Sequence, residues 1–167
     1  TWQQVYLRHF SKFMCLSIFA LIFMGALVTS NNAGLAVPDW PTTYGENMFL
    51  YPPSKWVGNI FYEHVHRLVA SGVGLLTLVL AGGLWATKER RWLKGLAILS
   101  CVLVLLQGVL GGLTVRWLLP PAVSSMHAVL AQTYLLLMLF IAFALSREWQ
   151  RHPGLHVDPT IRRFGML

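Results

Sequence analysis

Four long stretches of the chain are almost entirely apolar, and polar residues are concentrated between them. A helix needs about 20 mostly apolar residues to cross a membrane, and each stretch reaches that length once its flanks are included. The pattern therefore predicts membrane-spanning helices at about residues 10–30, 58–87, 93–116 and 122–146. It leaves a long loop at 31–57 and a tail at 147–167.

These spans predict an all-α fold, namely an integral membrane four-helix bundle with up-down-up-down topology over residues 1–146. Composition agrees, because 56% of the 167 residues are hydrophobic and only 11% are charged, against about 25% charged in a typical soluble domain. The net charge of +7 does not indicate a nucleic-acid partner, since the basic residues lie at helix ends rather than along one face. We expect lipid, and no nucleic acid, around this protein.

The basic residues also predict how the chain is oriented. Ten Lys and Arg residues precede the first span, fill the second loop or follow the last span, whereas Lys55 and Arg116 lie on the opposite side. The positive-inside rule then places both termini in the cytoplasm and the 31–57 loop outside. A signal peptide at residues 13–28 is the alternative for the first span. Cys15 and Cys101 fall inside spans and are expected to be free thiols.

Ionisable residues are concentrated at the start of the second span. Glu63, His64, His66 and Arg67 occur there together, and ionisable groups at membrane depth favour a functional interpretation. Glu63 and His66 are three residues apart and share a helix face. His64 points elsewhere, and we expect it to form a hydrogen bond with the loop.

The fourth span contains a single histidine, His127, at the depth of His66. His66 lies 20 residues before Ala86, and His127 lies 19 residues before Ser146, so each is about 30 Å from the cytoplasmic end of its span. The second and fourth helices of such a bundle are parallel and diagonally opposite. Two imidazoles facing each other across a bundle core predict axial ligation of a heme iron by His66 and His127.

Other interpretations of this cluster stay open. Zinc prefers four donors, and Glu63 supplies only a third. The two histidines could also simply form hydrogen bonds between helices. Arg67 and Arg116 could hold heme propionates or extend their charged groups to the membrane surface. Glu63 could move protons near a heme or orient a loop amide.

Two further features concern packing. The 31–57 loop is rich in Gly, Pro, Asn and Thr, and its aromatic residues suit the membrane boundary, so it is either a lid on the bundle or an ordinary connection. Gly108 and Gly112 have the spacing of small residues that predicts close approach of a neighbouring helix.

Several motifs, in order, resemble the heme A synthase family. They are Gly25-Ala-Leu-Val-Thr29, Gly34-Leu-Ala-Val-Pro-Asp-Trp-Pro41, Glu63-x-x-His66-Arg67, Gln107-Gly-Val-Leu-Gly-Gly-Leu-Thr-Val115 and Leu119-Pro-Pro-x-Val-x-x-x-His127. The resemblance implies eight spans in two halves, each half with a histidine pair, one holding heme b and the other receiving the substrate heme O. It also implies that a methyl group of heme O is oxidised to the formyl group of heme A through successive hydroxylation, with molecular oxygen or water-derived oxygen and an external electron donor.

By this resemblance Glu63 corresponds to a functionally important glutamate, and His66 and His127 to heme-binding histidines. The heme site would face the outer side of a prokaryotic cytoplasmic membrane. The sequence departs from the family in having no cysteine pair in the long loop, in having Thr29 where an arginine is common, and in showing one half only. The single half predicts a homo-oligomer or a subunit of a larger respiratory membrane complex. The alternatives are a noncatalytic bis-histidine cytochrome b-type subunit, for electron transfer or respiratory complex assembly, and a structural subunit without heme.

Overall fold

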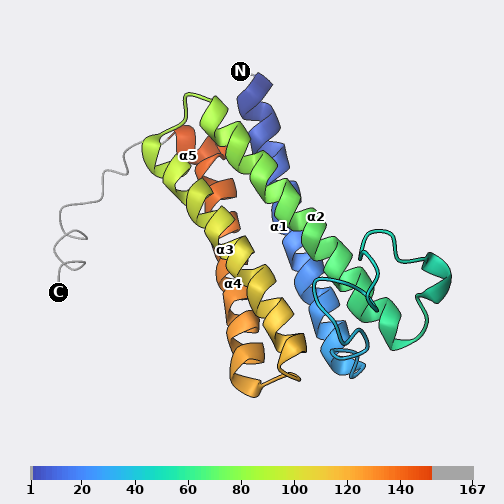
Figure 1. Ribbon diagram of the computed structural model, residues 1–167. Coiled ribbons are helices and arrows are strands. Elements are labelled where there is room, and N and C mark those ends of the chain that lie inside the picture. The colour runs from blue at the N-terminus through green and yellow to red at the C-terminus, as the bar shows by residue number, and fades with distance from the viewer. Residues whose placement is uncertain (1, 152–167) are drawn as a thin grey trace, which may run out of the picture.

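The structure, a computed structural model, describes residues 2–151, and these residues contain helices but no strand (Figure 1). Four of the helices are long and apolar enough to cross a membrane. The elements in chain order are α1 (Trp2–Ser30), η1 (Pro53–Lys55), α2 (Asn59–Ala86), α3 (Arg91–Arg116), α4 (Pro121–Ala144) and α5 (Arg147–Arg151). The predicted four-helix membrane bundle is confirmed.

The helix bounds follow the sequence pattern with one difference. The last three long helices begin and end within two residues of the predicted spans, but α1 begins at Trp2 rather than near residue 10. Its buried face, formed by Leu7, Ser11, Met14 and Ile18, starts before the apolar run and repeats at helical spacing, which keeps the first turns packed against the bundle. The part of the predicted tail after Arg151 lies outside the described residues.

The four long helices are arranged in a ring in chain order. Helix α1 packs against α2 and α4, and α3 packs against the same two helices, so α2 and α4 are diagonally opposite. Trp2 and α5 lie at one end, called here the terminal end, and the long loop (residues 31–58) lies at the other, the loop end (Figure 1). At the terminal end Arg8 donates a hydrogen bond of 3.0 Å from Nε to the carbonyl oxygen of Leu145.

Fully buried apolar side chains fill the terminal half of the bundle. On α2 the buried core cluster begins at Val73, on α4 it begins at Tyr134, and on α1 it ends at Ile18. Where this core ends, the hydroxyls of Thr77 and Tyr134 form a 2.5 Å hydrogen bond across the diagonal between α2 and α4. The interior of the loop half is therefore left to other, more polar side chains.

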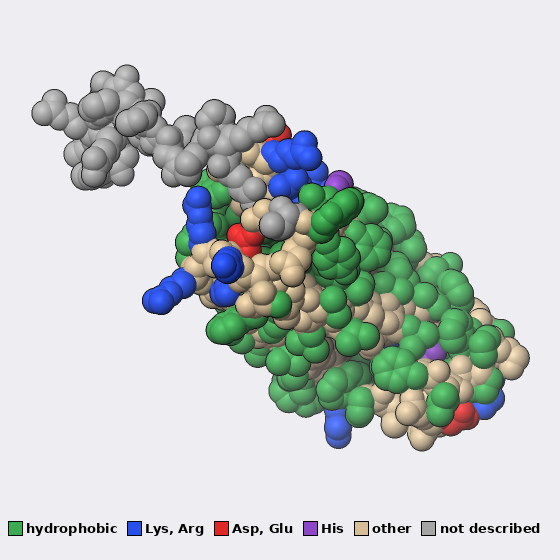
Figure 2. Space-filling view, turned by 90° about the horizontal axis from the view of Figure 1, so that it is seen from above, with side chains coloured by type: hydrophobic (Ala, Val, Ile, Leu, Met, Phe, Trp, Pro, Cys, Tyr) green, Lys and Arg blue, Asp and Glu red, His purple; other side chains and the backbone are tan. Residues whose placement is uncertain are grey.

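Charge is distributed unevenly over the surface. Figure 2 shows Lys and Arg side chains gathered around the terminal end, and mostly hydrophobic side chains over the rest of the visible face. An apolar surface bounded by a basic end suits a bundle within a membrane. The cytoplasmic location of the terminal end stays a prediction.

The long loop has a defined internal structure. Val37, Thr43 and Tyr51 are buried within it, and Thr43 and Glu46 exchange backbone hydrogen bonds of 3.0 Å. The carboxylate of Asp39 accepts hydrogen bonds from the amides of Tyr44 (2.8 Å) and Gly45 (2.9 Å). Of the two interpretations left open by the sequence, these contacts favour a folded lid.

Candidate functional site

His66 on α2 and His127 on α4 each pack against a glycine of the preceding helix. A Cβ added to Gly25 on α1 would lie 3.2 Å from Cε1 of His66, and one added to Gly111 on α3 would lie 3.1 Å from Cε1 of His127. Any larger residue would push the ring away. The two glycines thus allow each imidazole to lie close to its neighbouring helix.

Neither imidazole forms a hydrogen bond with the protein among residues 2–151. Nδ1 of His66 and Nδ1 of His127 are both buried and unpaired. The structure therefore does not show the hydrogen bond between helices that the sequence left open as an alternative. Buried polar atoms without a partner are rare and call for an explanation.

Two more unpaired polar atoms lie in the same half of the bundle. Gln107 on α3 donates a 2.9 Å hydrogen bond from Nε2 to the carbonyl oxygen of His127, while its Oε1 is buried without a partner in the part of the chain that the structure describes. Ser124, one turn before His127, has a buried unpaired Oγ. A ligand between the helices would supply the missing contacts, and a pair of imidazole donors suits the iron of a heme.

Glu63 and Arg67 face the long loop. They form a buried ion pair of 2.5 Å, and the Glu63 side chain also accepts a 2.7 Å hydrogen bond from the amide of Val37. Arg67 donates to the carbonyl oxygens of Val37 (2.7 Å), Asp39 (2.7 Å) and Thr42 (3.2 Å). The structure thus places both residues one turn or less from His66 in sequence, but directs their charged groups at loop backbone.

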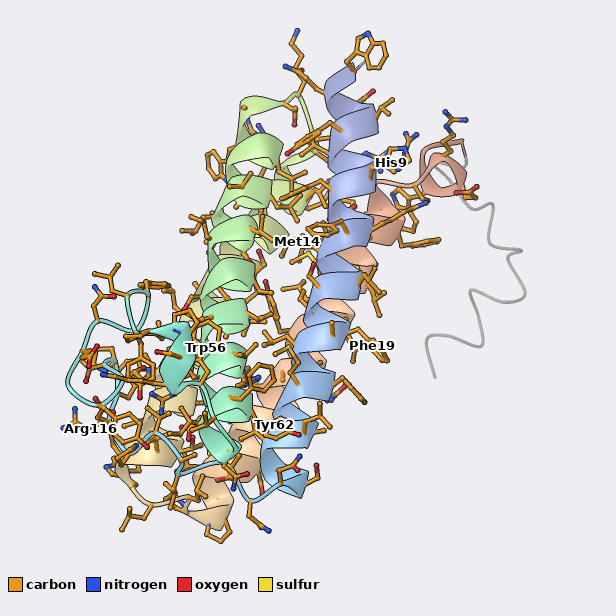
Figure 3. The ribbon with its side chains drawn as sticks, turned by 90° about the vertical axis from the view of Figure 1, so that its right-hand side faces the viewer. His9, Met14, Phe19, Trp56, Tyr62 and Arg116 are labelled. Carbon is orange, nitrogen blue, oxygen red and sulfur yellow. The ribbon has the colours of Figure 1, made fainter. Side chains whose placement is uncertain are left out.

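His64 also contacts the loop, as the sequence predicted. It is fully buried, its Nδ1 lies 3.2 Å from Oγ1 of Thr43, and its ring packs beside Tyr51 and Trp56, with centroid distances of 5.3 and 4.8 Å. Figure 3 shows Trp56 beside α2 at the loop end. His64 therefore helps to hold the loop on α2.

Arg116 is an exposed residue at the last turn of α3. Figure 3 shows it at the loop end, directed away from the bundle. Its guanidinium has no protein partner among residues 2–151, unlike that of Arg67. Of the two arginines predicted to contact a heme, only Arg116 keeps all its N–H groups available.

The electrostatics of the loop centre on Asp39. Burial by itself raises the pKa of this carboxyl, but hydrogen bonds from the amide of Gly45, the hydroxyl of Thr42 and the amide of Tyr44 outweigh it, and the pKa is lowered. Hydrogen bonds to a carboxylate stabilise its charged form. The ionised carboxylate therefore fixes the turn that contains Thr42.

The structure brings no further metal ligands to the two histidines among residues 2–151, so it does not support a zinc site. Among residues 2–151, no group of three or more His, Cys, Asp or Glu side chains could hold a metal ion. Glu63, the third donor considered from the sequence, is held by Arg67 and Val37 instead. Two histidines remain, which is the number needed for the two axial positions of a heme.

Two features of the site were missed in the sequence. The first is the pairing of each histidine with a glycine, although both glycines lie within the motifs that carry the family resemblance. The second is the role of Gly112, which meets the indole of Trp40 rather than a helix, while Gly108 has open space around it. The small-residue spacing was therefore wrong for Gly108, and at Gly112 the close approach comes from a loop indole rather than from a neighbouring helix.

Comparisons with known proteins agree with the motifs. A family model described as cytochrome oxidase assembly protein, COX15-CtaA, matches residues 8–167. A heme A synthase from Exiguobacterium sibiricum is 33% identical over 122 residues, which cover 71% of this chain and 39% of that protein. One from Geobacillus kaustophilus is 27% identical over 161 residues, covering 93% of this chain and 49% of that protein.

The chain spans about half, or less, of the length of these curated relatives. No solved structure matches it. The family match covers nearly the whole sequence, and the four apolar helices agree with it. The chain is a multi-pass integral membrane protein and belongs to the COX15-CtaA family of cytochrome oxidase assembly proteins.

Proposed function

We propose that this chain binds heme between His66 and His127 and takes part in making heme A from heme O. The observation that carries the proposal is the matched environment of the two histidines, each set against a glycine and each with a buried unpaired nitrogen. The names of the relatives, heme A synthase, support the reaction. The prosthetic group would supply the oxidative chemistry at its iron and porphyrin.

The residues of the chain would bind and orient the heme. His66 and His127 would hold the heme iron, since they lie on diagonally opposite helices and their rings have no hydrogen-bond partner among residues 2–151. Arg116 at the loop end would pair with a propionate at the water boundary. Gln107 would act indirectly, because its hydrogen bond to the carbonyl oxygen of His127 fixes that turn of α4.

Glu63 was predicted from the sequence to act at the reacting edge of the heme. Proton transfer by its carboxylate would require it to leave the Val37 amide and Arg67. The same holds for Arg67 as a propionate ligand, because it would have to give up loop carbonyls. These contacts favour a positioning role for the pair, in which it holds the loop.

The proposal places the heme on the outer side of a prokaryotic cytoplasmic membrane, within reach of an external electron partner. The resemblance implies two four-helix units, so the reaction would also involve a second unit beside the one described, and a homo-oligomer or a larger respiratory membrane complex is the proposed setting. The contacts of Glu63, whose carboxylate is held by Arg67 and the amide of Val37, favour a second candidate function. In that case the chain is a noncatalytic bis-histidine cytochrome b-type subunit for electron transfer or respiratory complex assembly.

One purification tests the ligand assignment. We expect the reduced protein to show the spectrum of a low-spin, six-coordinate heme, and chromatography of the extracted heme to identify heme b, heme O or heme A. His66→Ala and His127→Ala should each abolish the low-spin spectrum, since each removes an axial ligand. A normal low-spin spectrum in either variant would show that the assignment is wrong.

The two candidate functions differ in what happens to added heme O. Conversion to a product with a formyl group supports participation in heme A synthesis. Heme b that persists without any conversion, in the presence of the second unit and an electron donor, supports the electron-transfer or assembly subunit. A purified chain without heme would exclude both.

A further inference from the structure

The ion pair of Glu63 and Arg67 fastens the loop at several points. The Glu63 side chain accepts from the amide of Val37, and Nη2 of Arg67 donates both to Glu63 and to the carbonyl oxygen of Val37. Nη1 of Arg67 donates to the carbonyl oxygens of Asp39 and Thr42. Glu63 is 3% exposed and Arg67 is 9% exposed, so water does not compete strongly for these bonds.

The hydrogen bonds of the Arg67 guanidinium indicate that the ion pair holds the loop. The four N–H groups of Nη1 and Nη2 match four acceptors, of which three are loop carbonyls. Only the Nε–H of Arg67 remains for a propionate, and the usual two-pronged contact with a carboxylate is not available. The two Nη groups of Arg67 are thus fully occupied by the loop and Glu63.

The segment held by this pair carries Trp40, whose indole lies on α3. A Cβ added to Gly112 would lie 2.4 Å from Cδ2 and 2.6 Å from Cε2 of Trp40, a separation at which only glycine fits. The loop segment is thus anchored to α2 by Glu63 and Arg67 and laid on α3 by Trp40. It bridges the two hairpins at the loop end.

Gly112 is next to Gly111, the residue against which His127 packs. The indole of Trp40 and the imidazole of His127 therefore contact adjacent residues of one helix turn. A planar ligand that extends from His127 around this turn of α3 would meet Trp40, whose flat aromatic surface can exclude water and pack against a ring.

We propose that Trp40 forms a wall of the heme site, and that Glu63 and Arg67 are positioning residues that hold Trp40 in place through residues 37–42. The wall role rests on the proposed heme function, whereas the clamp made by Glu63 and Arg67 does not. In this scheme Glu63 influences the heme through the loop and does not touch it. Loss of Glu63 and displacement of Trp40 then have the same consequence.

The clamp is tested first on the full chain without heme, in lipid nanodiscs, by amide hydrogen exchange. Gly112→Ala pushes Trp40 off α3 without changing the ion pair, and Gly108→Ala is the matched control one turn earlier, where a Cβ meets nothing within 4 Å. We expect Gly112→Ala and Glu63→Gln each to speed exchange at residues 37–43 by about tenfold or more, the effect of losing a buried charge-assisted contact. Gly108→Ala should leave it unchanged.

The wall is tested next by the rate at which loaded protein loses heme to excess apomyoglobin. Trp40→Ala, Gly112→Ala and Glu63→Gln should all speed heme loss, and the double variant of Trp40→Ala with Glu63→Gln should lose heme no faster than the faster single variant. Such non-additivity is expected when one residue acts through the other. Gly108→Ala should again match the unmodified chain.

Two results would overturn the proposal. One is unchanged exchange at residues 37–43 in both Gly112→Ala and Glu63→Gln. The other is Glu63→Gln protein that keeps its loop protection and its heme but no longer supports conversion of heme O, because the carboxylate would then act directly on the substrate. If the unmodified chain binds no heme, the proposed function and the wall role fall together, while the exchange result still decides the clamp.

Discussion

At the scale of single residues, the two halves of the candidate site are built alike. Gly25 on α1 faces Cε1 of His66, and Gly111 on α3 faces Cε1 of His127, at nearly the same separation. Each histidine belongs to the second helix of its hairpin, and each glycine to the first. No internal repeat is visible in the sequence, because the connections between glycine and histidine differ greatly in length. What the two hairpins share is the packing of a histidine on the second helix against a glycine on the first.

Adding a methyl group at either glycine tests this arrangement. Gly25→Ala and Gly111→Ala each place a carbon about 0.3 Å inside ordinary contact with an imidazole, and such overpacking costs about 1 kcal/mol. We expect heme affinity to fall about fivefold in each variant when the free energy is lost from the bound state. Heme titration followed by absorbance measures the change.

Another glycine of α3, Gly95, supplies the control for this prediction. A Cβ at Gly95 meets nothing within 4 Å, so Gly95→Ala should bind heme as the unmodified chain does. Unchanged affinity in Gly25→Ala and in Gly111→Ala would show that the rings need not stay close to the neighbouring helices.

At the scale of elements, the long loop depends on one carboxylate for its tightest turn. Asp39 accepts from the amides of Tyr44 and Gly45 and from the hydroxyl of Thr42, while its own carbonyl oxygen accepts from Arg67. The side chain of Asp39 thus orders the turn, and its backbone fixes the turn to α2. Tyr44 and Gly45 both have positive φ, 51° and 77°, a conformation that these bonds help to hold.

This arrangement predicts how the turn responds to pH. The pKa of Asp39 is lower in the folded loop than in an unfolded chain, so its stabilisation is complete above the unfolded value of about 3.9 and is lost as the pH falls through the folded value. Protection of the Tyr44 and Gly45 amides, corrected for intrinsic exchange, should be constant near neutrality and fall below about pH 4.

Two variants separate this effect from other acidic groups. Asp39→Asn should remove the loss of protection between neutral and acidic pH, because its side chain does not titrate there. Glu46→Gln alters the exposed ion pair with Lys55 and should keep the pH response of the unmodified chain. A response that persists in Asp39→Asn would assign it to another group.

The elements also show what could be predicted from the sequence. The helix bounds and the common depth of His66 and His127 follow from apolar runs and from counting along helices, which are local properties. Contacts of the loop are not local: Trp40 meets Gly112, and Val37 meets Glu63. Nothing in the spacing of Glu63 and Arg67 distinguishes a pair that binds propionate from a pair that binds loop backbone, because both use the same charged groups.

At the scale of the whole molecule, stability and binding occupy opposite halves of the bundle. Buried apolar residues such as Met14, Leu80 and Met138 fill the terminal half, where dense packing stabilises the fold. The loop half instead contains the unpaired polar atoms of His66, Gln107 and His127. The hydrogen bond between Thr77 and Tyr134 lies at the boundary between the two halves. The loop half can therefore admit a large planar ligand while the packed terminal half keeps the bundle stable.

The orientation of the bundle decides on which side of the membrane this site opens, and single cysteines can determine it. In a chain with Cys15 and Cys101 replaced by alanine, Lys55→Cys lies in the long loop and Arg90→Cys lies between α2 and α3. Because ten basic residues are expected on the cytoplasmic side, an impermeant maleimide should label Lys55→Cys in intact spheroplasts and Arg90→Cys only after permeabilisation. The cysteine-free chain should take up no label. The reverse pattern would place the loop end, and with it the histidines, on the cytoplasmic side and would contradict the predicted orientation.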